Sequence, residues 1–217
     1  MLLNALVSLL GLSFDVYGQR APASPVVDLG YAIYEGTFNQ TTNVTSFLGI
    51  RFAAPPVRKL RFRAPQPSLN ERSLGVQKTD TIFIGCVQTG DGNKISTPFR
   101  PGNVDGLPQK RQSTNPEDCL FLNVWTPGTL KPNAKLPMLV WIHGGGYVAG
   151  NVVGTTSVDL IREAGGGLIA VTLDCRLGVF GFLPGAQVKQ KGGLNAGLLD
   201  QQAVLQWVRR NVTSLLQ

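Results

Sequence analysis

The part of the sequence best suited to chemistry is a glycine-rich segment that follows a short apolar run. Residues 138–142 are typical of a buried strand, and His143, Gly144, Gly145 and Gly146 come directly after them. Because glycine has no Cβ, the backbone N–H groups of successive glycines can turn toward one point and bind a developing oxyanion. A glycine-rich turn that binds no ligand explains the same residues equally well. The segment alone therefore leaves both interpretations open.

A dinucleotide site is the competing chemical interpretation of this segment. The spacing Gly144-x-Gly146-x-x-Ala149 after a strand satisfies the dinucleotide-binding fingerprint. That fingerprint should open directly into a helix, but Gly150 and the valines that follow it are poor helix formers. The sequence therefore disfavours a nicotinamide enzyme.

The elements that position the glycine segment alternate between short apolar strands and helices. Residues 120–125, 138–142 and 168–173 predict strands, and the last two are typical of fully buried strands in a parallel sheet. Residues 157–164 predict a helix that three glycines end. Residues 199–212 predict a longer helix with one apolar face, formed by Ala203, Val204, Trp207 and Val208. This alternation predicts an α/β fold.

The first half of the chain predicts less regular structure. Residues 31–52 have the pattern of short strands, and residues 53–68 contain four prolines, which predict an extended connection and not a helix. Residues 85–116 are rich in Gly, Asn, Pro and Lys and predict a long surface excursion.

The composition excludes several classes of protein. The 217 residues include 43% apolar residues, which is enough for one sizeable core, and 15% charged residues, which is too few for a disordered chain. One histidine and three cysteines form no cluster with zinc-site spacing. Twenty Lys and Arg against 13 Asp and Glu give a net charge of +7. The basic residues at 58–63 are interleaved with apolar ones, which is more typical of a solvated surface than of a nucleic-acid site.

The N-terminus has the features of an export signal. Residues 1–18 contain an apolar stretch and end in residues suited to cleavage before Gln19. The stretch is too short and too interrupted for a stable membrane span. We therefore expect a secreted protein whose folded domain occupies residues 19–217. Three Asn-x-Thr triplets are candidate glycosylation sites in such a protein, at Asn39, Asn43 and Asn211.

Five blocks of sequence resemble a known family. They occupy residues 47–53 with 60–65, 117–124, 143–147, 176–183 and 195–202, and read FLGIRFA with LRFRAP, EDCLFLNV, HGGGY, RLGVFGFL and NAGLLDQQ. In content and order these blocks resemble the type-B carboxylesterase/lipase family, the cholinesterase-like branch of the α/β-hydrolases. The resemblance covers nearly all of residues 26–212. It implies the N-terminal part of an α/β-hydrolase fold, with a mixed, mostly parallel sheet, flanking helices and an end before the nucleophile elbow.

The resemblance assigns roles to the glycine segment. Gly145 and Gly146 match the two backbone donors of the family's oxyanion hole, in a loop that also contains Gly144 and Tyr147. His143 matches a histidine that shapes this loop and is not the general base. Its place at the end of a buried strand favours the same role, since it is better suited to orient backbone than to shuttle protons.

Structural contacts are also implied by the resemblance. The family's disulfide matches Cys86 with Cys119, and two structural ion pairs match Arg61 with Glu117 and Arg176 with Asp200. Asp174 and Cys175 depart from the Asn and Tyr that are usual in the family. Cys175 has no remaining partner, so we expect a buried free thiol and not a nucleophile.

The function implied by the resemblance is hydrolysis of small-molecule carboxylic esters by a serine enzyme, without a cofactor. In this fold the catalytic serine lies in a G-x-S-x-G elbow, and Asp or Glu and then His follow it along the chain. No serine of this sequence lies in such an elbow, and its single histidine belongs to the glycine segment. We therefore expect an N-terminal fragment that lacks the triad and is inactive alone. The alternative is a non-catalytic cholinesterase-like secreted protein, or a pseudogene product, with an interaction role.

Overall fold

The computed structural model of the protein describes residues 24–83, 85–88, 117–128 and 135–215. The expected signal peptide at residues 1–18 lies outside the described residues, as does most of the expected surface excursion at residues 85–116. No helix of the described part is long and apolar enough to cross a membrane.

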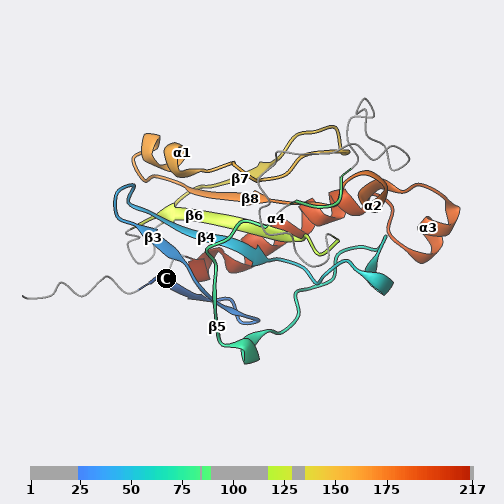
Figure 1. The fold of residues 1–217 in the computed structure, drawn as a ribbon, viewed down its shortest axis with the longest axis horizontal. Helices are drawn as coiled ribbons and strands as arrows, with labels where there is room; N and C mark the ends of the chain where they lie inside the picture. The colour runs from blue at the N-terminus through green and yellow to red at the C-terminus, as the bar shows by residue number, and fades with distance from the viewer. Residues whose placement is uncertain (1–23, 84, 89–116, 129–134, 216–217) are drawn as a thin grey trace, which may run out of the picture.

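A five-stranded sheet forms the centre of the fold (Figure 1). Its strand order is β3 (Thr37–Asn39), β4 (Val44–Arg51), β6 (Phe121–Pro127), β8 (Ile169–Leu173) and β7 (Met138–Ile142). The sheet is mixed, as expected, but only β7 and β8 pair in parallel and the other neighbours pair antiparallel. Parallel neighbours need a crossover connection, which α1 (Val158–Glu163) provides between β7 and β8. The described strands are therefore less parallel than the sequence led us to expect.

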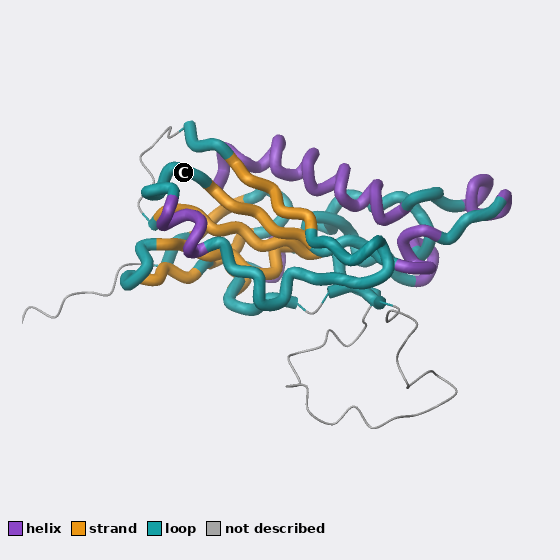
Figure 2. Tube along the Cα trace, turned by 90° about the horizontal axis from the view of Figure 1, so that it is seen from above, coloured by secondary structure: helices purple, strands orange, loops and turns teal. Residues whose placement is uncertain are grey.

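Helices cover both faces of this sheet, and each encloses part of the core. Figure 2 shows the longest helix, α4 (Ala196–Leu215), running along one face. Val204 and Trp207 of α4 pack there in one apolar cluster with Leu122 and Val124 of β6, which confirms the predicted apolar face. Successive side chains of a strand point to opposite faces, so Trp125 joins a second cluster with Ile161 of α1.

A smaller sheet packs in the same apolar cluster as α4. It has the order β1 (Val26–Asp28), β2 (Ile33–Glu35) and β5 (Val76–Lys78). Tyr31 connects this small sheet to β4 and α4. Its hydroxyl donates to the Arg51 carbonyl at 2.6 Å and accepts from Trp207 Nε1 at 3.0 Å. The chain between β4 and β5 contains two short 3-10 turns, η1 (Arg58–Leu60) within the proline-rich connection and η2 (Arg72–Leu74) after it.

Strand β7 departs from the sequence prediction. Strand β8 is fully buried, as expected, whereas β7 lies at the edge of the sheet and three of its side chains are exposed. Leu139 is 38% exposed, Trp141 51% and Ile142 39%. The prediction of full burial was wrong because an apolar run does not reveal whether a strand has a second neighbour.

The connection between β8 and α4 also differs from the expectation. It contains two short helices that the sequence did not predict, α2 (Gly178–Phe182) and α3 (Ala186–Lys191). Helix α4 begins at Ala196, three residues before the predicted start. Figure 1 shows α2 and α3 beyond one end of the sheet, from which α4 runs back along it.

Candidate active site

The glycine segment forms a tight loop at the end of β7. The carbonyl of Gly145 accepts hydrogen bonds from the N–H groups of Val148 at 3.2 Å and Ala149 at 3.1 Å. Gly145 has φ +117° and Gly146 φ +62°, a region that only glycine adopts without strain. A Cβ on Gly145 would lie 1.8 Å from the Ala149 carbonyl oxygen, so no other residue fits there.

The loop presents backbone donors that have no partner in the described part of the chain. Among the hydrogen bonds of the described residues, none uses the N–H of Gly145 or Gly146. Successive N–H groups in a turn of this kind can converge on an anion. The arrangement is therefore suited to binding a negatively charged oxygen.

An open groove of about 340 Å³ lies beside this loop. Three elements line it: the end of β7 with its loop, the segment that follows β8, and helix α4. The lining residues are Ile142, His143, Gly144, Gly146, Tyr147, Cys175, Leu177 and Gln201. Gly145 is not among them. Because β7 and β8 are parallel, the groove lies outside the carboxyl ends of adjacent strands, where α/β sheets commonly bind ligands.

The single histidine contacts the loop backbone. His143 Nδ1 lies 2.8 Å from the Gly144 carbonyl oxygen, and its Nε2 is buried without a hydrogen-bond partner among the described residues. A Cβ on Gly150 would lie 2.3 Å from Nδ1, so the imidazole packs directly on that glycine. No carboxylate of the described residues is hydrogen-bonded to this ring.

Tyr147 joins the loop to the helices after β8. Its carbonyl accepts from the Gly178 N–H at 2.7 Å, and its ring centroid lies 4.9 Å from that of Phe182. The side chain is 57% exposed at the mouth of the groove. It can therefore contact a ligand in the groove while its backbone is held in place.

Cys175 is a buried free thiol, as expected. Gln201 Nε2 donates to its sulfur at 3.6 Å, and burial raises the pKa of the thiol to about 11. The thiol therefore stays protonated at neutral pH, which argues against a cysteine nucleophile.

The implied disulfide and both implied ion pairs are present. Cys86 is bonded to Cys119, which precedes β6. Arg61 Nε donates to Glu117 Oε2 at 2.6 Å near the surface. Arg176 and Asp200 are paired in the interior, with 3% and 0% of their side chains exposed. These pairs connect loops to the core and lie outside the lining of the groove.

The candidate glycosylation sites differ in their setting. Asn39 and Asn43 are exposed at the turn between β3 and β4. Asn211 instead lies within α4, where its Nδ2 donates to the Trp207 carbonyl at 2.9 Å. The turn is thus the more accessible of the two places for a glycan.

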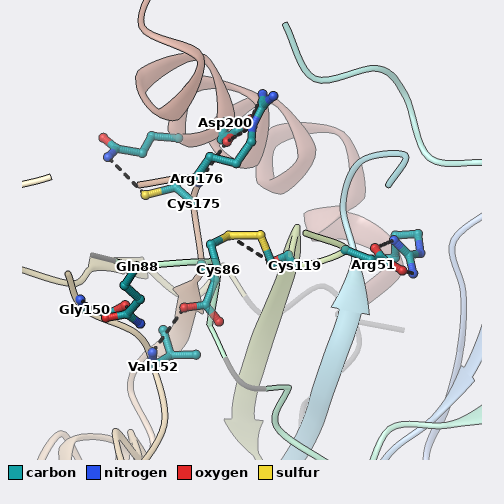
Figure 3. Close-up of a disulfide and its surroundings, with 12 residues drawn as sticks. Arg51, Cys86, Gln88, Cys119, Gly150, Val152, Cys175, Arg176 and Asp200 are labelled. Carbon is teal, nitrogen blue, oxygen red and sulfur yellow. Dashed lines mark hydrogen bonds and ion pairs between the residues drawn. A yellow bond between two sulfur atoms is a disulfide. The ribbon is translucent and has the colours of Figure 1, made fainter. Parts of the chain in front are cut away.

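Two glutamines at this site were not predicted from the sequence. Gln201 lines the groove from α4, and Gln88 forms hydrogen bonds with the backbone of Gly150 at the far end of the loop (Figure 3). Gln88 is separated from Gly150 by 62 residues in the sequence. No local sequence pattern signals a contact of that kind.

Comparisons with known proteins show the family to which this fold belongs. Residues 23–215 match the carboxylesterase family. Lipase 1 of Geotrichum candidum is 36% identical over 94% of this chain and 38% of its own length. Carboxylesterase 1D of Mus musculus is 37% identical over 80% of this chain and 29% of its own length. The crystal structure of Aspergillus niger EstA superimposes with a TM-score of 0.72 at 34% identity, over 89% of this chain and 34% of that structure.

The chain thus spans between 29% and 38% of the length of these three relatives. Its mixed sheet and flanking helices are those of the α/β-hydrolase fold that these esterases share. On the match over residues 23–215 and these identities, the chain belongs to the carboxylesterase family.

Proposed function

We propose that this chain is the N-terminal part of a secreted serine carboxylic-ester hydrolase and that Gly145 and Gly146 supply donors of its oxyanion hole. The observation that carries the proposal is the pair of N–H groups that have no hydrogen-bond partner among the described residues, beside a groove at the carboxyl ends of β7 and β8. Membership of the carboxylesterase family supports the reaction class.

The reaction is acyl transfer from the ester to a serine and then to water. As the serine oxygen attacks the ester carbonyl, the carbonyl oxygen gains negative charge, which backbone N–H groups stabilise. A histidine takes the serine proton and passes it to the leaving alcohol, and water then releases the acid by the same route. We propose that the serine, the acidic residue and this histidine lie beyond the present chain, because it has no G-x-S-x-G segment and its one histidine packs on the loop.

Two observations support secretion. Secreted lipase 1 of Botryotinia fuckeliana is 35% identical over 92% of this chain. The disulfide between Cys86 and Cys119 suits an oxidising compartment. We extend the proposal to residues 1–18 as the signal peptide and 19–217 as part of the catalytic domain.

The proposal is tested by ester hydrolysis with the complete gene product. We expect turnover of p-nitrophenyl butyrate and its loss after treatment with a phosphonate ester that phosphonylates the catalytic serine of serine hydrolases. Gly145→Ala should lower kcat about 100-fold. The added methyl group would collide with the Ala149 carbonyl and move the backbone donors of the loop out of position.

Gly154→Ala is the matched control. Gly154 also has a positive φ, of +80°, but a Cβ there meets no atom within 4 Å, so kcat should stay near the wild-type value. If the complete gene product hydrolyses no carboxylic ester, the assignment is wrong and the non-catalytic alternative takes its place.

A further inference from the structure

The glycine loop is not held in place by regular secondary structure. Beyond the turn at Gly145, its end at Gly150 has φ +122°, and a Cβ there would lie 2.3 Å from both the Gly144 carbonyl oxygen and His143 Nδ1. The loop therefore closes on itself at Gly150. Contacts that reach Gly150 from outside the loop therefore act on the loop as a whole.

Gln88 makes that contact through both ends of its side-chain amide. Its Nε2 donates to the Gly150 carbonyl at 2.8 Å, and its Oε1 accepts from the Gly150 N–H at 2.9 Å. The amide thus pairs with the backbone of one residue as a neighbouring strand would. Figure 3 shows the side chain directed at Gly150.

Gln88 is itself anchored to the centre of the sheet. Gln88 lies two residues after Cys86. The disulfide from Cys86 to Cys119 connects this segment to the residues just before β6. The same segment packs closely along the end of the loop, since a Cβ on Gly85 would lie 2.5 Å from Asn151 Cβ. A continuous connection thus runs from β6 through the disulfide and Gln88 to Gly150 (Figure 3).

We propose that Gln88 is a positioning residue for the oxyanion loop, which it holds through Gly150 from the disulfide-anchored segment. This inference rests on the proposed function. Gln88 does not line the groove, so it acts on the loop and not on the substrate.

The first test is hydrogen exchange, measured by mass spectrometry on the complete gene product. In Gln88→Leu, which removes both hydrogen bonds, peptides covering residues 143–153 should exchange about tenfold faster, with β6 and β8 unchanged. Gln88→Glu keeps only the acceptor and should give an intermediate rate. Gln187→Leu replaces an exposed glutamine of α3 and is the control that should leave the loop unchanged. Wild-type exchange of the loop in Gln88→Leu would overturn the proposal.

The second test separates positioning from substrate binding. In Gln88→Leu, kcat for p-nitrophenyl butyrate should fall by up to about 100-fold while KM stays within about twofold, because the donors act mainly in the transition state. Faster loop exchange with an unchanged kcat would overturn the positioning role. A wild-type protein inactive on all esters would refute the proposed function instead, and the exchange experiment would still decide whether Gln88 holds the loop.

Discussion

Arg176 and Asp200 form a buried ion pair that fixes the segment after β8 to helix α4. Arg176 Nε and its backbone N–H both donate to Asp200 Oδ2, at 2.8 and 3.0 Å, and its Nη2 donates to Oδ1 at 2.6 Å. Burial raises the pKa of Asp200, and these hydrogen bonds from Arg176 oppose the shift. Cys175 and Leu177 flank Arg176 and line the groove, so the pair sets one wall of the site.

Removing one partner of this pair should therefore destabilise the protein strongly. Asp200→Leu leaves the Arg176 charge buried and unpaired, so we expect the free energy of unfolding to fall by about 3–5 kcal/mol. The double variant with Arg176→Met should recover much of that loss, because no buried charge remains. Urea denaturation of the single and double variants measures the coupling.

The exposed ion pair in α1 is the control for the variants of the buried pair. Asp159 and Arg162 lie 3.5 Å apart with 81% and 59% of their side chains exposed. Their replacement by Leu and Met should change the free energy of unfolding by less than about 0.5 kcal/mol. Equal effects at the two pairs would contradict a structural role for the buried one.

Asp174 should make the protein less stable as the pH rises. It is 2% exposed and accepts one hydrogen bond, from the Val152 N–H at 3.3 Å, and burial raises the pKa of its carboxyl to about 7. Its folded pKa lies above its unfolded value, so its contribution to stability is full below about pH 4 and is lost as the pH rises toward 7.

Asp174→Asn removes this titration but keeps an acceptor for Val152. The variant should match the wild type near pH 4 and be more stable by several kcal/mol at pH 8, since one pKa unit corresponds to about 1.4 kcal/mol. Denaturant unfolding of both proteins between pH 4 and 8 measures the difference. Parallel curves across that range would show that the buried carboxyl does not titrate there.

The disulfide should stabilise the protein as well as anchor Gln88. Its cysteines are 33 residues apart in the sequence, and the chain-entropy model values the closure of such a loop at roughly 3–4 kcal/mol. Cys86→Ser with Cys119→Ser should lower the free energy of unfolding by about that amount, as measured by urea denaturation. Cys175→Ser at the free thiol is the comparison variant. A disulfide variant as stable as the wild type would contradict this prediction.

If the protein is secreted as proposed, its glycans should be attached at the turn between β3 and β4. When the protein is expressed in a eukaryotic host, Asn39→Gln with Asn43→Gln should abolish the mobility shift on deglycosylation. Asn211→Gln should leave the shift intact, because that side chain is hydrogen-bonded within α4. A shift that disappears only with Asn211→Gln would refute this assignment.

The sequence predicted the parts of the fold that local patterns encode. The apolar face of α4 follows from helical periodicity at Val204 and Trp207, and the loop after β7 follows from its glycines. The exposure of Trp141 does not follow from the residues of its own strand, because an apolar run does not reveal whether the strand has a second neighbour. The role of Gln88 was equally hidden, since its partner Gly150 is distant in sequence.

The most direct test of the central claim is a crystal structure of the complete gene product after reaction with a phosphonate ester. We expect a phosphonylated serine whose phosphonyl oxygen lies about 2.7–3.1 Å from the backbone nitrogens of Gly145 and Gly146. A phosphonyl oxygen bound elsewhere, with both glycine N–H groups facing solvent, would contradict the assignment of the oxyanion hole.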